Sequence, residues 1–109
     1  MWTLEEGLVL IRTIQPLMRG RKWHVALGGG VLTNGLSAKD IDLYVMPFDN
    51  EVNDDIVPTL CELWGDATRM RSYPPQACYE SKWMFTVDEK RIDVFIGLRG
   101  GPERKTDAV

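Results

Sequence analysis

The chain has 109 residues, of which 44% are hydrophobic and 27% charged, so its composition is that of one soluble globular domain rather than a disordered or disulfide-stapled protein. Its 13 lysines and arginines stand against 16 aspartates and glutamates. The resulting formal charge of -3 argues against a protein that holds nucleic acid mainly by neutralising phosphates.

Targeting signals and cysteine usage favour a cytoplasmic protein. Glu5 and Glu6 lie where a secretory signal would need a cationic and then an apolar stretch, and no run of residues approaches the length of a membrane span. Cys61 and Cys78 belong to no CxxC or Cys/His cluster with zinc spacing, so we expect free thiols in a reducing compartment. A membrane partner is not expected.

The first predicted element is a helix that begins at Thr3 and ends at Gly20. Thr3 and Glu6 form a capping box, in which each side chain satisfies a free backbone donor at the helix start. Pro16 disturbs the pattern near its end. Apolar spacing predicts that one face of this helix covers a sheet. That face comprises Leu4, Leu8, Ile11 and Gln15, widened by Val9, Leu10 and Ile14.

Two strands are predicted next. Residues 23–27 form a short strand that runs directly into Gly28, Gly29 and Gly30. Residues 40–45 alternate at period two, which places Asp40, Asp42 and Tyr44 on one side of a strand. Its aliphatic residues, on the other side, are Ile41, Leu43 and Val45.

The second half of the chain predicts a helix and a hairpin. Residues 51–64 have the apolar spacing of a helix closed by Gly65, and Pro58 favours a first turn that starts later than the pattern. Residues 83–87 and 91–96 predict two strands joined by the polar turn 88–90. In the second strand Asp93 lies on the side opposite its aliphatic residues, which are Ile92, Val94 and Ile96.

These elements predict an α+β fold: a small mixed sheet with both helices packed on one face. The aliphatic sides of the two alternating strands form the core, and the acidic sides face away from the helices. We expect the domain to comprise residues 1–98, followed by a flexible tail over 99–109, where glycines and charges replace the periodic pattern.

Three carboxylates are the candidate catalytic and metal-binding residues. Asp40 and Asp42, two apart on a strand, project side by side and need a positive partner. Asp93 lies on a strand of the same kind, and all three converge if the two strands are neighbours. Such hard oxygen ligands suit Mg²⁺ or Mn²⁺, with a nucleoside triphosphate completing the metal's shell.

The glycine run upstream is the candidate nucleotide-binding segment. Gly28, Gly29 and Gly30 carry no Cβ, so their backbone N–H groups can approach the triphosphate. A tight turn is the commoner use of glycine, but the acids that follow favour phosphate binding. Lys39 is beside the acids and is a candidate phosphate ligand, although a solvated lysine is the commoner case.

Several other polar and aromatic residues have a structural interpretation that competes with a functional one. Arg69 and Arg71 could bind a phosphate, but an exposed edge strand explains them equally well. His24 has no metal-binding companion, which favours a structural or surface role. The tryptophans are expected in the core or at an interface, and they include Trp23, Trp64 and Trp83.

Residues 27–31 and 39–43, together with 91–94, resemble the signature of the DNA polymerase beta-like nucleotidyltransferase superfamily. That signature is an apolar strand, Gly-Gly or Gly-Ser, about ten residues, Asp-apolar-Asp, and a third carboxylate on a later strand. The Gly-Gly form resembles tRNA and antibiotic nucleotidyltransferases. The resemblance implies transfer of a nucleoside monophosphate from a triphosphate to a hydroxyl, with release of pyrophosphate. It also implies that Asp40 and Asp42 bind two metals, and that Asp93 binds the second and helps to deprotonate the hydroxyl.

The chain also departs from the tRNA enzymes, which carry an Arg-Asp pair where Leu32 and Thr33 stand here. They have further domains for which 109 residues leave no room, so a role in building tRNA ends is not expected. The acceptor is open between RNA, protein and a small molecule, and a second copy or a protein partner could complete the site. The alternatives are a catalytically degenerate binding or regulatory factor, of toxin-antitoxin or viral type, and an α+β interaction domain whose acids are surface residues.

Overall fold

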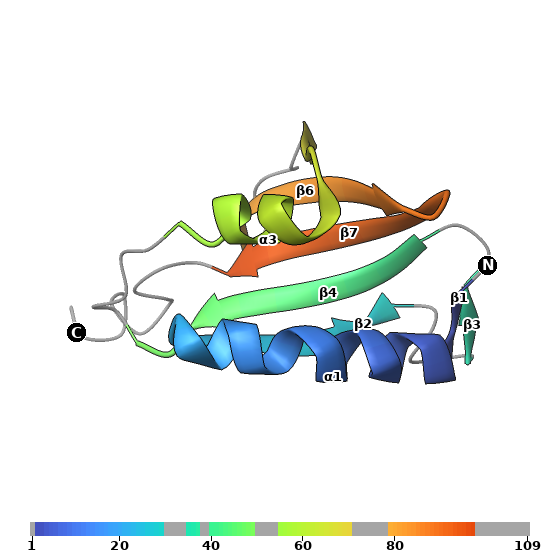
Figure 1. Cartoon of the computed structure of the whole chain (residues 1–109), viewed down its shortest axis with the longest axis horizontal. Helices are drawn as coiled ribbons and strands as arrows, with labels where there is room; N and C mark the ends of the chain where they lie inside the picture. Colours follow the sequence, from blue (N-terminus) through green and yellow to red (C-terminus); the bar gives the residue numbers. More distant parts are fainter. Residues whose placement is uncertain (1, 30–34, 38–39, 50–54, 71–78, 98–109) are drawn as a thin grey trace, which may run out of the picture.

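The computed structural model describes residues 2–29, 35–37, 40–49, 55–70 and 79–97 (Figure 1). Within these ranges two helices cover a five-stranded mixed sheet, which confirms the predicted α+β fold class. Some predicted features lie outside the described residues, namely Gly30, Lys39, Arg71, Cys78, residues 51–54 and the tail 99–109. No helix in the described part of the chain is long and apolar enough to cross a membrane.

The main sheet has the strand order β2-β4-β7-β6-β5. Its central strands, β4 and β7, run parallel, whereas the other neighbours are antiparallel. The two strands that carry the candidate carboxylates are therefore adjacent, as the acidic site requires. The strand bounds are β2 Trp23–Gly28, β4 Asp40–Pro47, β5 Thr68–Met70, β6 Tyr79–Val87 and β7 Lys90–Gly97.

A second, two-stranded sheet, which the sequence patterns do not predict, holds the start of the chain. It pairs β1 (Trp2–Thr3) with β3 (Leu36–Ser37) in antiparallel fashion. The indole Nε1 of Trp2 donates a hydrogen bond to the backbone oxygen of Arg91 at 2.8 Å, and Lys90 forms an ion pair with Glu6. These contacts tie the beginning of the first helix to the end of the hairpin.

Helix α1 (Leu4–Gly20) begins at the predicted capping box. Glu6 N donates to Thr3 Oγ1 at 3.1 Å, and Thr3 N donates to Glu6 Oε1 at 3.0 Å. Pro16 lies inside the helix without ending it.

The buried face of α1 agrees in part with the predicted one, since Ile14 is buried and Leu10 and Ile11 pack against the core. Leu8 and Val9 are exposed, while the fully buried positions are Gly7, Ile14 and Met18. Gly7 explains the rotation, because a Cβ there would lie 2.9 Å from Ile41 Cδ1. The helix therefore turns its glycine toward the sheet to approach it closely, which apolar spacing alone does not indicate.

Helix α3 (Val57–Trp64) begins later than the pattern of residues 51–64 suggests. Asp55 and Ile56 are not helical, and Asp55 Oδ1 accepts a hydrogen bond from Val57 N at 3.0 Å. Pro58 occupies the first turn, where its missing N–H costs nothing. Gly65 ends the helix as predicted, with a φ of 88°.

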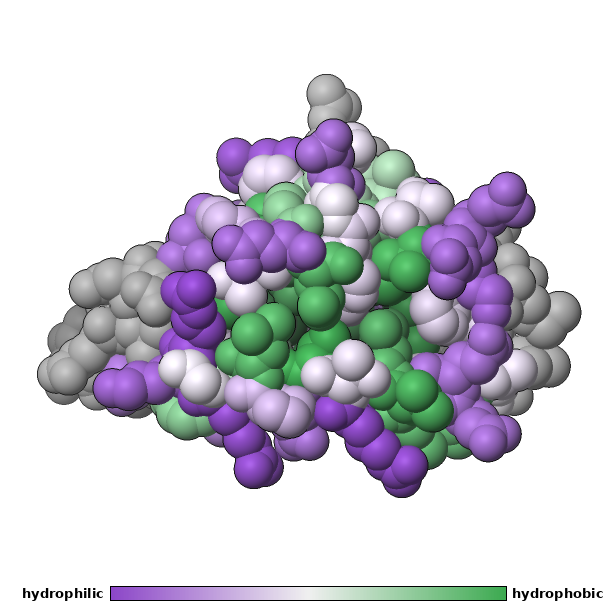
Figure 2. Space-filling view, in the orientation of Figure 1, coloured by the Kyte–Doolittle hydropathy of each residue, from purple (hydrophilic) through white to green (hydrophobic). Residues whose placement is uncertain are grey.

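Both helices pack on the same face of the main sheet, as predicted (Figure 1). The six aliphatic residues predicted for the core of β4 and β7 are all buried, and so is Phe85 of β6. Figure 2 views the molecule from this helix side and shows apolar side chains gathered between α1 and α3. The buried hydrophobic residues are Trp2, Ile14, Met18, Trp23, Ile41, Leu43, Val45, Ile56, Leu60, Phe85, Ile92, Val94 and Ile96.

The hairpin of β6 and β7 has a shorter turn and a longer first strand than predicted. Val87 pairs with Lys90, so Lys90 belongs to β7 and only Asp88 and Glu89 form the turn. Their φ angles are 51° and 66°, the left-handed values that a two-residue turn of this hand requires. A glutamate is poorly suited to this conformation, because its Cβ crowds the backbone.

We expect Glu89→Gly to stabilise the protein by about 1 kcal/mol, because glycine adopts the left-handed conformation without a steric cost. Glu62→Gly is the matched control: it removes an exposed glutamate from α3 and should destabilise by about 1 kcal/mol. Urea unfolding of both variants measures the two changes. Equal destabilisation by both substitutions would contradict the assigned turn.

Candidate functional site

The candidate site lies on the open face, which we define as the side of the main sheet opposite α1 and α3. Asp42 and Asp93 are direct partners in the parallel register of β4 and β7, and Asp40 is two residues before Asp42. One carboxylate oxygen from each of the three lies within 4.8 Å of the other two. The predicted convergence of the three acids is confirmed, whereas their role as metal ligands stays a prediction.

The cluster is crowded with negative charge. Asp93 is buried, with 1% of its surface exposed, and Asp40 and Asp42 are partly buried. Burial raises the pKa of Asp40, and a hydrogen bond to Asp93 and the charge of Asp93 raise it further. Burial also raises the pKa of Asp42, and the charges of Asp40 and Asp93 add to that effect. The ionised form of both groups is thus disfavoured in the folded protein without a bound cation.

Among the described residues, Arg91 and Lys82 partly compensate the cluster, and both contact Asp93. Arg91 donates from Nε to Asp93 Oδ1 at 2.7 Å and from its terminal nitrogen to Oδ2 at 3.2 Å. Lys82 Nζ lies 3.6 Å from Asp93 Oδ2. The hydrogen bond to Asp93 is the main cause of the raised pKa of Arg91. A buried aspartate paired in this way is stable without further ligands.

The sequence analysis did not identify these two residues as members of the site. Arg91 shares a strand face with Asp93 by simple alternation, so that signal was available. Lys82 comes from β6, where it pairs with Phe95 rather than with Asp93. Its position depends on the register of the hairpin, which cannot be read from composition or spacing.

The glycines at the end of β2 lie directly against the site. Gly28 is the partner of Asp42 in the antiparallel register, and a Cβ at Gly28 would lie 2.5 Å from Tyr44 Cε2. Gly29 has a φ of 71°, and a Cβ there would lie 2.2 Å from Asp42 Oδ2. Both positions therefore require glycine, and the backbone at Gly29 touches the carboxylate that the prediction makes central.

Arg69 and His24, the other candidates within the described residues, lie apart from the acids. Arg69 packs its guanidinium 5.8 Å from the ring centre of Trp83, whose partner in β7 is Val94, on the helix side of the sheet. Arg69 is exposed on the edge strand β5, as its structural interpretation predicts, and phosphate binding by Arg69 stays a prediction. His24 is exposed and packs on Phe48 at 4.4 Å between ring centres, in line with the predicted surface role. Trp23 is fully buried, and Cys61 is a free thiol.

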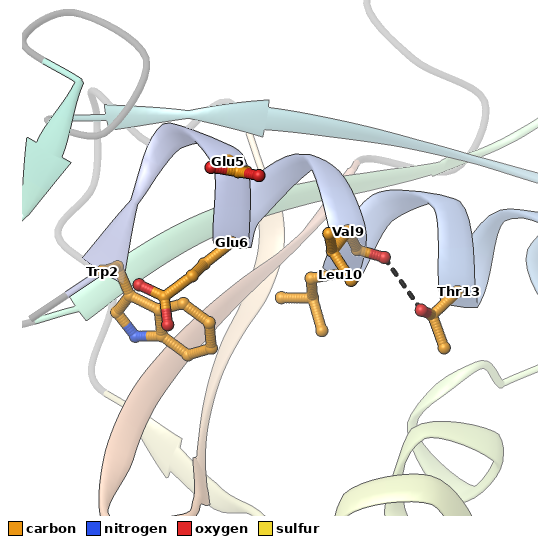
Figure 3. Close-up of a pocket in the computed structure, with 6 residues that line it drawn as sticks. All are labelled: Trp2, Glu5, Glu6, Val9, Leu10 and Thr13. Atoms are coloured by element: carbon orange, nitrogen blue, oxygen red, sulfur yellow. Dashed lines mark hydrogen bonds between the residues drawn. The ribbon is translucent and has the colours of Figure 1, made fainter.

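A cavity of about 420 Å³ lies along α1 (Figure 3). It is on the helix side of the sheet, away from the acidic cluster. Figure 3 shows the Thr13 hydroxyl turned back toward the helix, where it donates to Val9 O at 2.8 Å. The cavity therefore does not extend the candidate site. Its lining residues are Trp2, Glu5, Glu6, Val9, Leu10 and Thr13.

Comparison with known proteins adds no relative: no family model matches the chain, and neither a curated protein nor a solved structure does.

The raised pKa of Asp42 predicts that its charge opposes folding in the absence of metal. The folded state binds the proton of Asp42 more tightly than the unfolded state does. The contribution of Asp42 to the free energy of unfolding therefore falls as pH rises from its unfolded-state pKa to its folded-state pKa. Asp42→Asn should therefore be more stable than wild type at pH 7 with a chelator, by up to about 1 kcal/mol. Urea unfolding should show this advantage shrink toward pH 4.

Asp93→Asn is the comparison variant, and we expect it to lower stability where Asp42→Asn raises it. It removes charge-assisted hydrogen bonds from a buried side chain and should cost about 2 kcal/mol at pH 7. If both variants lost stability to the same extent, the inference that the cations compensate Asp93 more than Asp42 would be wrong.

Proposed function

We propose that the chain is a metal-dependent nucleotidyltransferase, which transfers a nucleoside monophosphate from a nucleoside triphosphate to a hydroxyl and releases pyrophosphate. The observation that carries the proposal is the juxtaposition of Asp40, Asp42 and Asp93 on one sheet face, with oxygens within 4.8 Å. Gly29 against Asp42 adds the second element, a glycine at the end of β2 that lies directly beside the acids. The resemblance of the two motifs to the DNA polymerase beta-like superfamily supplies the reaction.

The donor set fits Mg²⁺ or Mn²⁺, because these ions prefer a few carboxylate oxygens and complete their shell with water and phosphate. The raised pKa values of Asp40 and Asp42 indicate negative charge that Arg91 and Lys82 leave uncompensated. Bound divalent ions would stabilise the charge on the attacking and leaving oxygens. A single added cation near Asp42 would be attracted by all three carboxylates at once.

The glycines and the acids have different roles in the proposed reaction. Gly28 and Gly29 let the backbone approach the triphosphate, while the acids hold it in place through the ions. By the resemblance, Asp93 takes the side of the attacking hydroxyl and helps to remove its proton. The hydroxyl oxygen then bonds to the α-phosphorus, the bond from that phosphorus to the β-phosphate oxygen breaks, and pyrophosphate leaves with that electron pair.

The acceptor is an RNA, a protein or a small molecule with a free hydroxyl. No helix of the described residues covers the open face, so the acceptor, a second copy or a protein partner would complete the site. The cytoplasm is the compartment that this proposal implies, because triphosphates and Mg²⁺ are both plentiful there.

A second candidate is a degenerate member of the same fold that binds or regulates a partner without catalysis, as in toxin-antitoxin pairs or viral factors. The observation in its favour is that Arg91 donates hydrogen bonds to both carboxylate oxygens of Asp93. An aspartate held in this way has a structural role that would persist after catalysis was lost. The two candidates differ in whether pyrophosphate is released.

We expect a nucleoside triphosphate to raise the melting temperature only when Mg²⁺ or Mn²⁺ is present, because a ligand stabilises the native state in proportion to its binding there. Gly29→Ala should abolish this shift, since the new Cβ would collide with Asp42 Oδ2. Gly35→Ala, at a glycine with positive φ but open surroundings, is the matched control and should keep the shift. An equal shift with a chelator present would count against the proposal.

Pyrophosphate release tests catalysis itself. With a panel of hydroxyl acceptors, Asp42→Asn should reduce release at least about a hundredfold, because it removes a ligand to the ions. Asp93→Asn should also stop release but keep much of the triphosphate affinity measured by calorimetry. Asp66→Asn removes an exposed carboxylate elsewhere and should leave both unchanged. Triphosphate binding by wild type without release for any acceptor would favour the regulatory candidate.

A further inference from the structure

An aromatic stack lies beside the acidic cluster on the open face. The rings of Tyr44 and Phe95 are stacked, with centres 4.7 Å apart and planes at 14°. Tyr79 packs its edge against Phe95 at 5.0 Å, and Lys82 Nζ lies 5.0 Å from the centre of the same ring. Together these four residues, which we call the aromatic stack, form a platform of π surface with one cation.

The aromatic stack is continuous with the candidate site. Tyr44 follows Asp42 by two residues and Phe95 follows Asp93 by two, so each ring is one step of about 7 Å along the same strand face from an acid. The Tyr44 ring also lies close to Gly28, where an added Cβ would contact its Cε2. A molecule with its phosphates at Gly28 and Gly29 would therefore have its next chemical group over the stack.

Tyr44 is the exposed member of the stack, whereas Phe95 and Tyr79 are half-buried. Tyr44 keeps 39% of its surface exposed, although the neighbouring aliphatic residues of β4 are fully buried on the helix side. The small side chain of Ala26, its partner in β2, adds no bulk beside the ring. An exposed, ordered apolar surface next to polar groups is typical of a ligand-binding site.

We propose that the aromatic stack binds the nucleobase of the triphosphate. The inference rests on the proposed function, because the acids and glycines place the phosphates. A base presents a flat π surface, and stacking on the face of Tyr44 turned away from Phe95 binds it without reading its hydrogen-bonding edge. The subsite therefore adds affinity for any nucleotide and discriminates only weakly among bases. Lys82, between Phe95 and Asp93, links the base subsite to the acidic cluster electrostatically.

The test compares two ligands that share the phosphates and differ in the base. Calorimetry with excess Mg²⁺ measures the dissociation constants of ATP and of inorganic tripolyphosphate for four proteins: wild type, Tyr44→Leu, Tyr44→Phe and Phe48→Leu. Tyr44→Leu should weaken ATP about tenfold and leave tripolyphosphate unchanged, as expected for the loss of one stacking contact. Tyr44→Phe keeps the ring and should retain wild-type affinity for both ligands.

Phe48→Leu is the matched control. It removes an exposed ring of the same strand region that packs on His24 rather than in the stack, and it should change neither affinity. Circular dichroism and urea unfolding of each variant identify a loss of fold, and the wild-type comparison of ATP with tripolyphosphate decides the test if Tyr44→Leu is unstable.

The outcomes separate this inference from the proposed function. Equal affinities of wild type for ATP and tripolyphosphate would overturn the base subsite and leave the phosphate and metal site standing, as would a loss of both ligands in a folded Tyr44→Leu. Failure of wild type to bind either ligand would overturn both proposals. If Tyr44→Leu abolished self-association in sedimentation experiments while ATP affinity stayed unchanged, the stack would be a contact between copies, and the base subsite would be wrong.

Discussion

The parallel register of β4 and β7 is the constraint on which the rest of the structure depends. The pairing that places Asp42 beside Asp93 also places Ile41 beside Ile92 and Leu43 beside Val94. A slip of one residue would turn the aliphatic side of one strand to water and the acids into the core. Burial of the aliphatic side therefore holds the carboxylates together against their mutual repulsion, so the site is stabilised by the opposite face of the sheet.

Charge within the cluster is distributed unevenly. Arg91 and Lys82 both contact Asp93, which is fully buried, while Asp40 and Asp42 keep raised pKa values from burial and from their acidic neighbours. Asp93 with its cations resembles an ordinary buried ion pair, whereas the negative charge of Asp40 and Asp42 is not fully compensated. A divalent ion would therefore bind near Asp40 and Asp42.

Much of the fold follows from local patterns in the sequence. The capping box at Thr3, the alternation in β4 and β7 and the glycine at the end of α3 depend on neighbours within a few residues, and all are confirmed. The buried face of α1 was predicted only in part, because Gly7 has no hydrophobic side chain, yet its lack of bulk allows the close contact with Ile41.

The site was predictable to the extent that it depends on alternation along single strands. Convergence of the three acids required only that β4 and β7 be neighbours. The contacts of Lys82 and the stacking of Tyr44 on Phe95 depend on the registers of three strands together. No local pattern specifies such registers, which follow from the packing of the whole core.

We propose that Asp40, Asp42 and Asp93 hold divalent metal together with a nucleoside triphosphate. Anomalous diffraction from crystals grown with Mn²⁺ and a non-hydrolysable triphosphate is the decisive test. We expect a Mn²⁺ peak within coordination distance of Asp42 and at least one of the other two aspartates, with phosphate density beside Gly28 and Gly29. Density for the triphosphate elsewhere, or an unchanged Arg91–Asp93 pair with no Mn²⁺ at the triad, would contradict it.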